Sequence, residues 1–495
     1  MSVNDIFLTG TVMEKRNISR SVVLSGLLWR WLERVGAQGV QFIVSLVLAR
    51  LLAPEVFGTV ALINVIIAIL EVFVDSGLGN SLIQKKEADD LDFSTVFYFN
   101  IFVCCVLYVC LFFAAPFIAG FYNLPELISP IRVIGIILVI SGVKNVQQAY
   151  ISRTMQFKLF FYATLCGTIG AAVLGIWMAA EGFGIWALIA QSLFNMTVDT
   201  IILWVTVKWR PKRMFSWERL KILLTYGWKL LVSSLLDTGY NRLRQMVIGK
   251  LYTPTSLAFY DKGSTFPAIV VNNINASMNS VLFPAMSSEQ DDKDKIKNLT
   301  RRAIKTSSYI MWPMMLGLCA CAKPIVIILL TEKWLPCVPY LRIFCITYAF
   351  YPIHTANLNA IKAMGRSDIF LKLEIIKKTI GFGLLVITMH HGVMAIAYSL
   401  LISCFTSQII NSWPNRKLLN YRYKEQIKDI IPSIALSALM FVIVWSIQFL
   451  HLNIFFTFIV QVIGGAAIYL GGSLIFKIDS FSYLLTLFGE LRKRQ

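Results

Sequence analysis

Long apolar stretches, each followed by a short polar segment, recur along almost the whole chain. About 20 apolar residues are enough for a helix to cross the hydrocarbon core of a bilayer, which is ~30 Å thick. The backbone of such a span has to be helical, because hydrocarbon offers it no hydrogen-bond partner. The pattern therefore predicts an all-α polytopic membrane protein with about fourteen transmembrane helices. Their predicted limits are 27–52, 56–83, 94–118, 127–151, 160–181, 183–207, 222–249, 255–285, 302–330, 337–363, 369–390, 392–413, 428–450 and 453–476.

An internal repeat divides this series. The segment ARLLAPEVFGTVA (49–61) aligns with GKLYTPTSLAFYD (249–261), and further on Arg132 aligns with Arg342. The first span falls on the seventh, so both halves enter the membrane in the same sense, and such parallel repeats place a substrate between two halves that rock against each other. We expect two pseudo-symmetric six-helix bundles plus two C-terminal helices. The predicted regions are a cytoplasmic N-terminal segment (1–26), an N-terminal six-helix lobe (27–207), a cytoplasmic linker (208–221), a C-terminal six-helix lobe (222–413), a cytoplasmic loop (414–427), two extra transmembrane helices (428–476) and a cytoplasmic tail (477–495).

Composition supports the membrane prediction. The chain is 57% hydrophobic and 15% charged, whereas a soluble domain is about 45–50% apolar and about 25% charged. The 46 lysines and arginines exceed the 27 acidic residues. Nearly all of the basic residues that lie outside the spans fall in segments on one side of the membrane. Only four basic residues border the opposite side, namely Arg50, Lys250, Lys323 and Lys333. This positive-inside pattern predicts that both termini are cytoplasmic, and it explains the basic excess without a nucleic-acid partner.

Motifs for enzyme chemistry are missing from the sequence. We find no phosphate-binding loop of the type GxxxxGK[ST], no HExxH and no CxxC. The nine cysteines lack metal-ligand spacing with histidines, and the polar N-terminal segment lacks the order of a signal peptide. The predicted external loops are too short to hold a catalytic domain. We therefore expect neither an enzyme nor a bound metal or cofactor.

Polar residues inside the spans carry the functional information, because a charge in mid-span costs about 2.5–3.5 kcal/mol. In the first span and again in the seventh, polar residues recur at intervals of four, four, three and four, which places each set on one helix face. The first stripe comprises Arg30, Arg34, Gln38, Gln41 and Ser45, and the second comprises Lys229, Ser233, Asp237, Tyr240 and Arg244. Matching stripes on repeat-related helices predict a central aqueous cavity.

The second and eighth spans also match. The second carries Asn64, Glu71 and Asp75, and the eighth carries Asn272, Asn275 and Asn279, with Asp75 aligned to Asn275. The first half thus offers carboxylates where the second offers amides. Two prolines in the eighth span are expected to kink it.

Several of these residues have plain structural alternatives. Arg30 and Arg34 could snorkel to the cytoplasmic interface, and the span asparagines could simply bond neighbouring helices. We interpret Lys144 and Arg153 as interfacial and His354 as packed or hydrogen-bonded rather than as a proton carrier. Glu374 and Lys378 are predicted to form a structural i, i+4 pair. The basic and acidic residues of the spans are nearly balanced, which favours an anionic substrate only weakly.

Five segments resemble a known family. They are ARLLAPEVFGTVAL (49–62), VDSGLGNSLIQKK (74–86), FSTVFYFN (93–100), LTEKWLPCVPYLRI (330–343) and YPIHTANLNAIKAMGRSDIFLKLEIIKK (351–378). Together with the span count, they resemble the polysaccharide-transporter branch of the multidrug/oligosaccharidyl-lipid/polysaccharide exporter superfamily, in particular lipid-linked oligosaccharide flippases of the O-antigen and colanic-acid type. The resemblance implies two bundles in a V, with the first, second, seventh and eighth spans lining the cavity.

The resemblance also implies a function. A polyprenyl-pyrophosphate-linked oligosaccharide would move to the outer leaflet of the bacterial inner membrane for surface polysaccharide synthesis, by alternating access, with a polysaccharide polymerase complex as a further partner. We expect a monomer that contacts membrane lipid. Substrate-binding candidates are Arg30, Arg34, Gln38, Gln41, Lys229, Tyr240, Arg244 and Asn275, and ion-coupling candidates are Glu71, Asp75 and Asp237. The alternatives are an ion-coupled multidrug antiporter of the same superfamily, a membrane-embedded glycosyl transferase or ligase, and a non-transporting scaffold.

Overall fold

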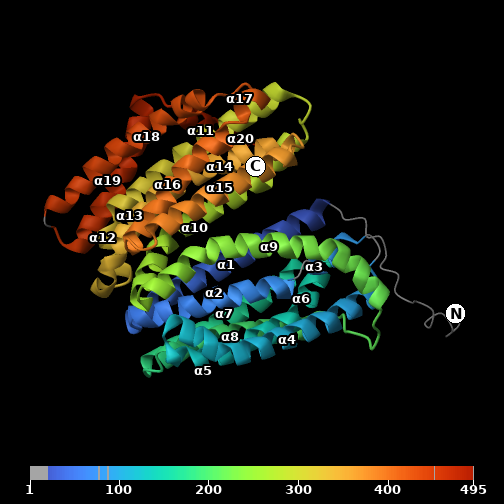
Figure 1. Cartoon of the computed structure of the whole chain (residues 1–495). Coiled ribbons are helices and arrows are strands. Elements are labelled where there is room, and N and C mark those ends of the chain that lie inside the picture. Colours follow the sequence, from blue (N-terminus) through green and yellow to red (C-terminus); the bar gives the residue numbers. More distant parts are fainter. Residues whose placement is uncertain (1–19, 76–77, 86–87, 451, 494–495) are drawn as a thin grey trace. The chain divides into compact units, whose positions relative to one another are not determined.

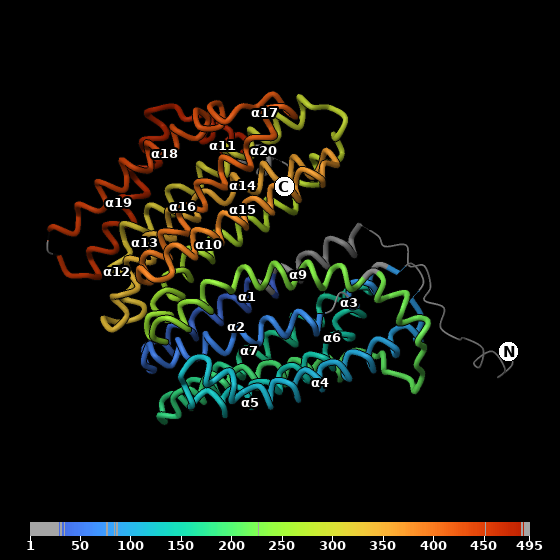
Figure 2. Tube along the Cα trace, in the orientation of Figure 1, coloured from blue at the N-terminus to red at the C-terminus, as the bar shows by residue number. Residues whose placement is uncertain are grey.

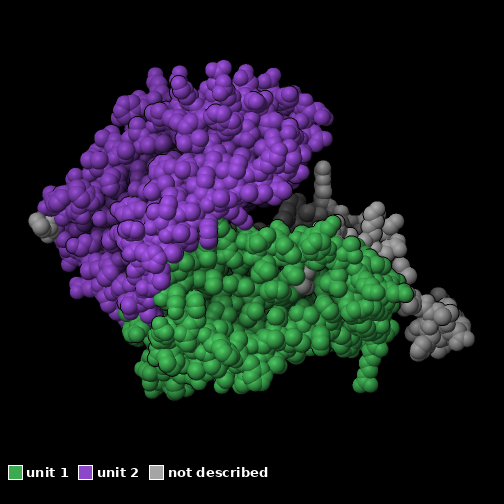
Figure 3. Space-filling model, viewed as in Figure 1, with its two compact units in different colours: residues 1–250 green, residues 251–495 purple. Residues whose placement is uncertain are grey.

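The computed structural model describes residues 20–75, 78–85, 88–450 and 452–493, and this part of the chain is helical, without a β-strand. Figure 1 gives the order of the helices and Figure 2 traces the chain through them. The chain divides into two compact units, Met1–Lys250 and Leu251–Gln495, which are coloured separately in Figure 3. The unit boundary lies one helix later than the predicted linker 208–221, so the helix of the seventh span groups with the first unit.

The first unit is a bundle in which α1 packs on α7, α7 on α8, and α4 on α6, while α2 contacts α4, α6 and α8. Its helices are α1 (Arg20–Leu51), α2 (Pro54–Asp75), α3 (Leu78–Gln84), α4 (Asp90–Tyr122), η1 (Pro125–Leu127), α5 (Ile128–Ile134), α6 (Ile136–Thr154), α7 (Phe157–Ala180), α8 (Ile185–Thr206) and α9 (Trp217–Leu251).

The second unit has the long helix α10 packed against α13 and α14, and α11 packed against α18. Its helices are α10 (Pro254–Ser287), α11 (Lys293–Ala320), α12 (Ala322–Leu329), η2 (Glu332–Cys337), α13 (Val338–Ala349), α14 (Tyr351–Ala363), α15 (Ser367–Thr388), α16 (Val393–Ser412), α17 (Asn415–Leu418), α18 (Tyr423–Ser446), η3 (Ile447–Leu450), α19 (Ile454–Ile475) and α20 (Asp479–Lys493).

Local sequence explains where several helices begin. Pro54 and Pro254 occupy the first turn of α2 and α10, where a proline removes no hydrogen bond and its fixed φ suits the helix. The N-cap of α4 is Asp89, which forms a reciprocal capping box with Asp92. At the other end of this helix, Asn123 adopts the left-handed conformation with φ 56°, which terminates the helix.

Each predicted span coincides with one helix or with consecutive helices of the structure. Eight helices in the described part of the chain are long and apolar enough to cross a membrane, and α11 with α12, bent by 67°, makes a ninth if the pair is one span. The count of fourteen stays a prediction. Pro267 and Pro284 do lie inside α10. The predicted tail contains a further helix, α20. It mixes apolar and charged residues, so it forms no long apolar stretch in the sequence.

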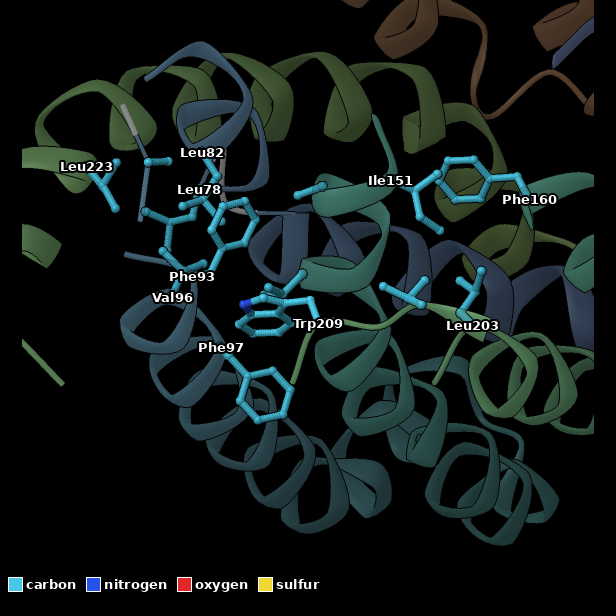
Figure 4. Close-up of a cluster of buried hydrophobic side chains, with 14 of the residues drawn as sticks. Leu78, Leu82, Phe93, Val96, Phe97, Ile151, Phe160, Leu203, Trp209 and Leu223 are labelled. Atoms are coloured by element: carbon cyan, nitrogen blue, oxygen red, sulfur yellow. The ribbon is translucent and has the colours of Figure 1, made fainter. Parts of the chain in front are cut away.

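The predicted linker 208–221 is packed into the first unit through Trp209. This side chain is 6% exposed in a cluster of buried apolar residues from α3, α4, α6, α7, α8 and α9. Figure 4 shows it between Phe93 and Phe97, and its ring centre lies 5.6 Å from that of Phe93. The Trp209 Nε1 group donates to Asp90 Oδ1 at 3.2 Å, and Lys212 forms an ion pair with Asp90 at 2.6 Å. This end of the first unit therefore holds the start of α9 in place.

Candidate functional site

The polar stripe of α1 is exposed where the structure describes it. The side chains of Gln38 and Gln41 are both exposed. Arg30 and Arg34 belong to α1, but their side chains lie outside the part that the structure describes. Glu33 accepts a hydrogen bond from Thr164 of α7 at 3.5 Å. The amides of Gln38 and Gln41 therefore lie on an exposed face of α1, and the cavity that they would line stays a prediction.

The stripe of α9 changes from exposed to buried along the helix. The side chains of Lys229 and Asp237 are exposed, Tyr240 is half-buried, and Arg244 is only 7% exposed. The guanidinium carbon of Arg244 lies 5.9 Å from the ring centre of Tyr240, within reach of a cation–π interaction. Its Nε and Nη2 atoms have no hydrogen-bond partner within the described residues.

This state of Arg244 has a chemical consequence. Burying a charge without hydrogen bonds is costly, whereas a guanidinium binds phosphate or carboxylate oxygens through two parallel hydrogen bonds. Arg244 is therefore suited to bind an anion. On the same helix, Asn241 Nδ2 donates to Asp237 Oδ2 at 3.2 Å, and Arg242 Nη1 donates to Gln245 Oε1 at 3.0 Å.

The acidic residues of α2 are held by α6. Asn145 Nδ2 donates to Asp75 Oδ1 at 3.3 Å and to the Val74 carbonyl at 3.1 Å. Glu71 lies within electrostatic reach of Asp75, Lys144 and Arg242. Two of the three predicted coupling carboxylates, Glu71 and Asp75, thus lie near one cation, Lys144, inside the first unit.

Gly79 leaves room for this contact. A Cβ atom at Gly79 on α3 would lie 2.9 Å from Asn145 Oδ1, closer than real Cβ contacts allow. A larger residue there would displace the Asn145 amide from Asp75.

Lys144 forms an ion pair that the sequence analysis did not predict. Its Nζ contacts Asp199 Oδ2 on α8, and the two side chains are only 12% and 10% exposed. The interfacial position of Lys144 stays a prediction, and the structure adds that a buried carboxylate compensates its charge. The signal for this pair in the sequence is the acidic residue inside the apolar stretch of α8. Arg153 caps the end of α3, donating to the Leu82 carbonyl at 2.7 Å.

The amides of α10 meet polar side chains of α14 in the second unit. Thr355 Oγ1 donates to Asn275 Oδ1 at 3.1 Å, and Asn359 Nδ2 donates to Asn279 Oδ1 at 2.8 Å. The third predicted amide, Asn272, is exposed. Of the asparagines for which bonds between helices were the structural alternative, Asn279 does bond a neighbouring helix, and the substrate-binding candidate Asn275 does so too.

His354 is packed and hydrogen-bonded, as predicted. Its Nδ1 lies 3.2 Å from Asn411 Nδ2, and its Nε2 lies 3.4 Å from Cys404 Sγ. Elsewhere in this unit, Glu374 pairs with Lys377 at 2.6 Å, one residue before the predicted Lys378.

The polar contacts of the two units correspond through the sequence repeat. At the offset that aligns Arg132 with Arg342, Asn145 aligns with Thr355 and Lys144 with His354. The bond from Asn145 to Asp75 thus matches the bond from Thr355 to Asn275. Lys144, which pairs with Asp199, likewise aligns with His354, which contacts Asn411, but at this offset Asp199 aligns with Ile409 rather than with Asn411. The positions of Asp75 and Lys144 thus carry charged side chains where the second unit has an amide and a histidine.

No group of three or more His, Cys, Asp or Glu side chains that could hold a metal ion is found among the residues that the structure describes.

Known proteins resemble this chain over most of its length. A family model described as polysaccharide biosynthesis protein matches residues 47–339, more than half of the chain. The succinoglycan biosynthesis transport protein ExoT of Rhizobium meliloti (strain 1021) is 22% identical over 360 residues, which are 73% of either chain. The lipopolysaccharide biosynthesis protein WzxC of Escherichia coli (strain K12) is 24% identical over 400 residues, 79% of this chain and 80% of WzxC.

A solved structure shares the fold. The inward closed conformation of the lipid II flippase MurJ matches with a TM-score of 0.76 and 15% sequence identity, covering 92% of this chain and 99% of MurJ. At this identity the likeness shows the fold alone. Together with the family match and the apolar helices, it identifies the chain as a multi-pass membrane protein that belongs to the polysaccharide biosynthesis protein family.

Proposed function

We propose that the protein is a flippase that moves a polyprenyl-pyrophosphate-linked oligosaccharide from the cytoplasmic to the outer leaflet of the bacterial inner membrane. The product would supply synthesis of a surface polysaccharide such as O-antigen, capsule or exopolysaccharide. Support comes from the family match, from relatives named for succinoglycan transport and lipopolysaccharide biosynthesis, and from a fold shared with a lipid II flippase. No phosphate-binding loop occurs in the sequence, so we infer an energy source other than ATP hydrolysis by this chain.

One observation carries the proposal, namely the buried Arg244 guanidinium with two unpartnered nitrogens. A pyrophosphate group would supply the missing acceptors. Charge-assisted hydrogen bonds of this kind are worth about 1.5–3 kcal/mol each. We assign the same role to Arg30, Arg34 and Lys229, which share the two polar stripes with it.

The remaining candidates divide by chemistry. Amides and hydroxyls suit the sugar or its acidic groups, so we assign this role to Gln38, Gln41, Tyr240 and Asn275. Carboxylates that gain and lose a cation suit coupling to an ion gradient, so we assign coupling to Glu71, Asp75 and Asp237. Each charge that crosses the membrane contributes about 2.3 kcal/mol per 100 mV.

The transport cycle that we propose is alternating access by the two repeat-related lobes, 27–207 and 222–413. The polyprenyl tail would remain in the lipid. The prolines inside α10, Pro267 and Pro284, would allow that helix to bend. We further propose a monomer with both termini in the cytoplasm, which works beside a polysaccharide polymerase complex.

The test is the leaflet location of the lipid-linked oligosaccharide in cells that lack the protein. We expect it to accumulate on the cytoplasmic side and to return to the outer leaflet with the wild-type protein but not with Arg244→Ala. Arg366→Ala is the matched control, because Arg366 is an exposed arginine paired with Asp368, and it should rescue fully. Normal externalisation without the protein would refute the flippase.

The carboxylates of α2 favour one second candidate, a cation-coupled multidrug antiporter. Glu71 and Asp75 are close enough to influence each other, as expected where a cation binds. This function predicts drug sensitivity and intact polysaccharide assembly in the deletion strain. A glycosyl transferase or ligase would instead form a glycosidic bond in detergent with the purified protein.

A further inference from the structure

Two adjoining pockets lie in the second unit, and no residue of the polar stripes lines either of them. The first has a volume of about 640 Å³ and lies between the first turns of α11 and the start of α20. It is lined by basic side chains, which include Lys295, Arg301, Arg302 and Lys305, together with Tyr483 of α20. A basic pocket between membrane helices is suited to a phosphate-bearing head group.

The second pocket is apolar and adjoins the first. It has a volume of about 440 Å³ and is lined by Leu436, Leu439 and Phe476, while Lys305 and Asp479 line both pockets. Leu439 is 48% exposed and Phe476 is 66% exposed, so the apolar pocket opens at the surface of the unit. A ligand with one anionic end and one apolar end would fill both pockets at once.

The cations of the first pocket are not equally engaged. Arg301 is bound to Asp429 at 2.7 Å, and Lys295 is bound to Glu289 at 2.9 Å. Arg302 has no carboxylate partner within the described residues, and its guanidinium carbon lies 4.1 Å from the ring centre of Tyr483. One face of this guanidinium is covered by the ring while its edge donors remain available for a phosphate.

Lys305 is held less firmly than Arg301. Its Nζ lies 3.6 Å from Asp429 Oδ1 and 3.4 Å from Asp479 Oδ2, and the Asp479 side chain is 85% exposed. The pair with Asp479 is long and exposed and contributes little, and the distance to the buried Asp429 is longer than that of Arg301. Lys305 can therefore turn to an incoming anion at small cost, and it stands where the two pockets meet.

The level of the pockets in the membrane follows from α19. This helix is apolar enough to span a bilayer and ends at Ile475, and α20 begins at Asp479. The last residues of α19 and Phe476 are strongly exposed, with Ile475 at 77%. Such a patch of apolar side chains is expected to contact lipid. The basic pocket thus lies where the apolar helix leaves the hydrocarbon, which is the level of phospholipid phosphates.

We propose that the two pockets form one binding site for an anionic glycerophospholipid of the surrounding bilayer. Its phosphate lies against Arg302 and Lys305, and an acyl chain lies over Leu439 and Phe476. The bound lipid joins α20 to α11 and α18. In this part of the second unit, α11 packs against both α18 and α20. The site is independent of the transported substrate, because it shares no residue with the polar stripes.

Native mass spectrometry of the full chain in detergent tests the proposal, with titration of dioleoyl phosphatidylglycerol, dioleoyl phosphatidylcholine and, separately, glycerol phosphate. Phosphatidylglycerol should bind at least several-fold more tightly than phosphatidylcholine. Arg302→Gln should weaken its binding about fivefold, which corresponds to about 1 kcal/mol for one basic residue at a membrane surface. Arg302→Lys should retain most of the affinity, and Arg366→Gln should change nothing.

The apolar half of the site has its own test. Leu439→Gln should weaken phosphatidylglycerol binding while leaving any glycerol phosphate binding unchanged. Equal binding of the two lipids, or phosphatidylglycerol binding that Arg302→Gln leaves intact, would overturn the proposal. Glycerol phosphate that binds as tightly as phosphatidylglycerol would identify a site for a free phosphate ester and would also overturn it. Arg302→Lys keeps the charge but changes the same side chain. If replacing Arg302 caused misfolding, Arg302→Lys would lose binding as well.

Discussion

The side-chain amide of Asn145 on α6 donates a hydrogen bond of 3.3 Å to the Asp75 carboxylate on α2. The repeat-related bond of the second unit runs from Thr355 on α14 to Asn275 on α10 at 3.1 Å. The two units therefore preserve a contact while changing its charge. Because an amide fits the equivalent contact of the second unit, the negative charge at position 75 is not needed for this contact itself.

Asp75→Asn separates the charge of this contact from its geometry. An amide at position 75 copies Asn275 and can still accept from Asn145, so the fold should be stable to within about 1 kcal/mol, the size of one neutral hydrogen bond. Transport should fall strongly, because the coupling charge is gone. The checks are the melting temperature of the purified protein and the leaflet assay. Wild-type transport by Asp75→Asn would contradict the coupling role.

The buried ion pair of Lys144 with Asp199 allows a test of how much its charge compensation stabilises the protein. Lys144→Met leaves the Asp199 carboxylate buried without its cation and should destabilise the protein by about 3–5 kcal/mol. The double variant Lys144→His with Asp199→Asn replaces both charges with groups that can still hydrogen-bond and should recover most of that loss. Thermal unfolding in detergent measures both. A double variant as unstable as Lys144→Met would show that the loss does not come from the uncompensated Asp199 charge.

Gly263 on α10 marks the closest approach to α13. A Cβ atom there would lie 2.6 Å from Tyr340 Cβ and 2.9 Å from the backbone nitrogen of Leu341. Backbone atoms cannot yield as a flexible side chain can, so Gly263→Ala should destabilise the protein by about 1–3 kcal/mol.

Gly383→Ala is the matched control for this substitution. Gly383 also lies inside a helix of the second unit, but nothing lies within 4 Å of its added Cβ. The change should therefore be neutral, or stabilising by about 0.5–1 kcal/mol through helix propensity. Equal melting temperatures for the two alanine variants would contradict the close packing of α10 on α13.

The sequence predicted what depends on hydrocarbon as a solvent. Long apolar stretches form helices with small shifts at their ends, and Asp75 and Asn275, which align in the sequence, hold equivalent contacts in the structure. Pairing between polar groups that are distant in the sequence was not predicted, because the local pattern around Lys144 contains no information about its contact with Asp199. Trp209 was likewise assigned to a linker, since its burial depends on aromatic partners far away in the sequence. The helix α20 was not predicted for a different reason, because its mixture of apolar and charged residues forms no long apolar stretch.

Asp429 on α18 joins two other segments of the second unit. Arg301 Nη2 of α11 donates to Asp429 Oδ1 at 2.7 Å, and the Tyr421 hydroxyl donates to Asp429 Oδ2 at 2.7 Å. Burial raises the pKa of Tyr421, and the hydrogen bond to Asp429 raises it further. Because the pKa in the folded state exceeds the unfolded value of about 10, the contribution of Tyr421 is fully present below pH ~10. It is lost as the pH rises from there toward the folded-state value.

Tyr421→Phe should therefore act in two ways. At neutral pH it removes a hydrogen bond to a charged group and should lower the stability by about 1.5–3 kcal/mol. Above pH ~10 the wild-type protein loses the Tyr421 contribution while the variant has none to lose, so the difference between their melting temperatures should shrink. Thermal unfolding at pH 8 and at about pH 10.5 measures this, with Tyr398→Phe as the control because Tyr398 is 50% exposed. A difference that stays constant with pH would show that Asp429 does not hold Tyr421 in its neutral form.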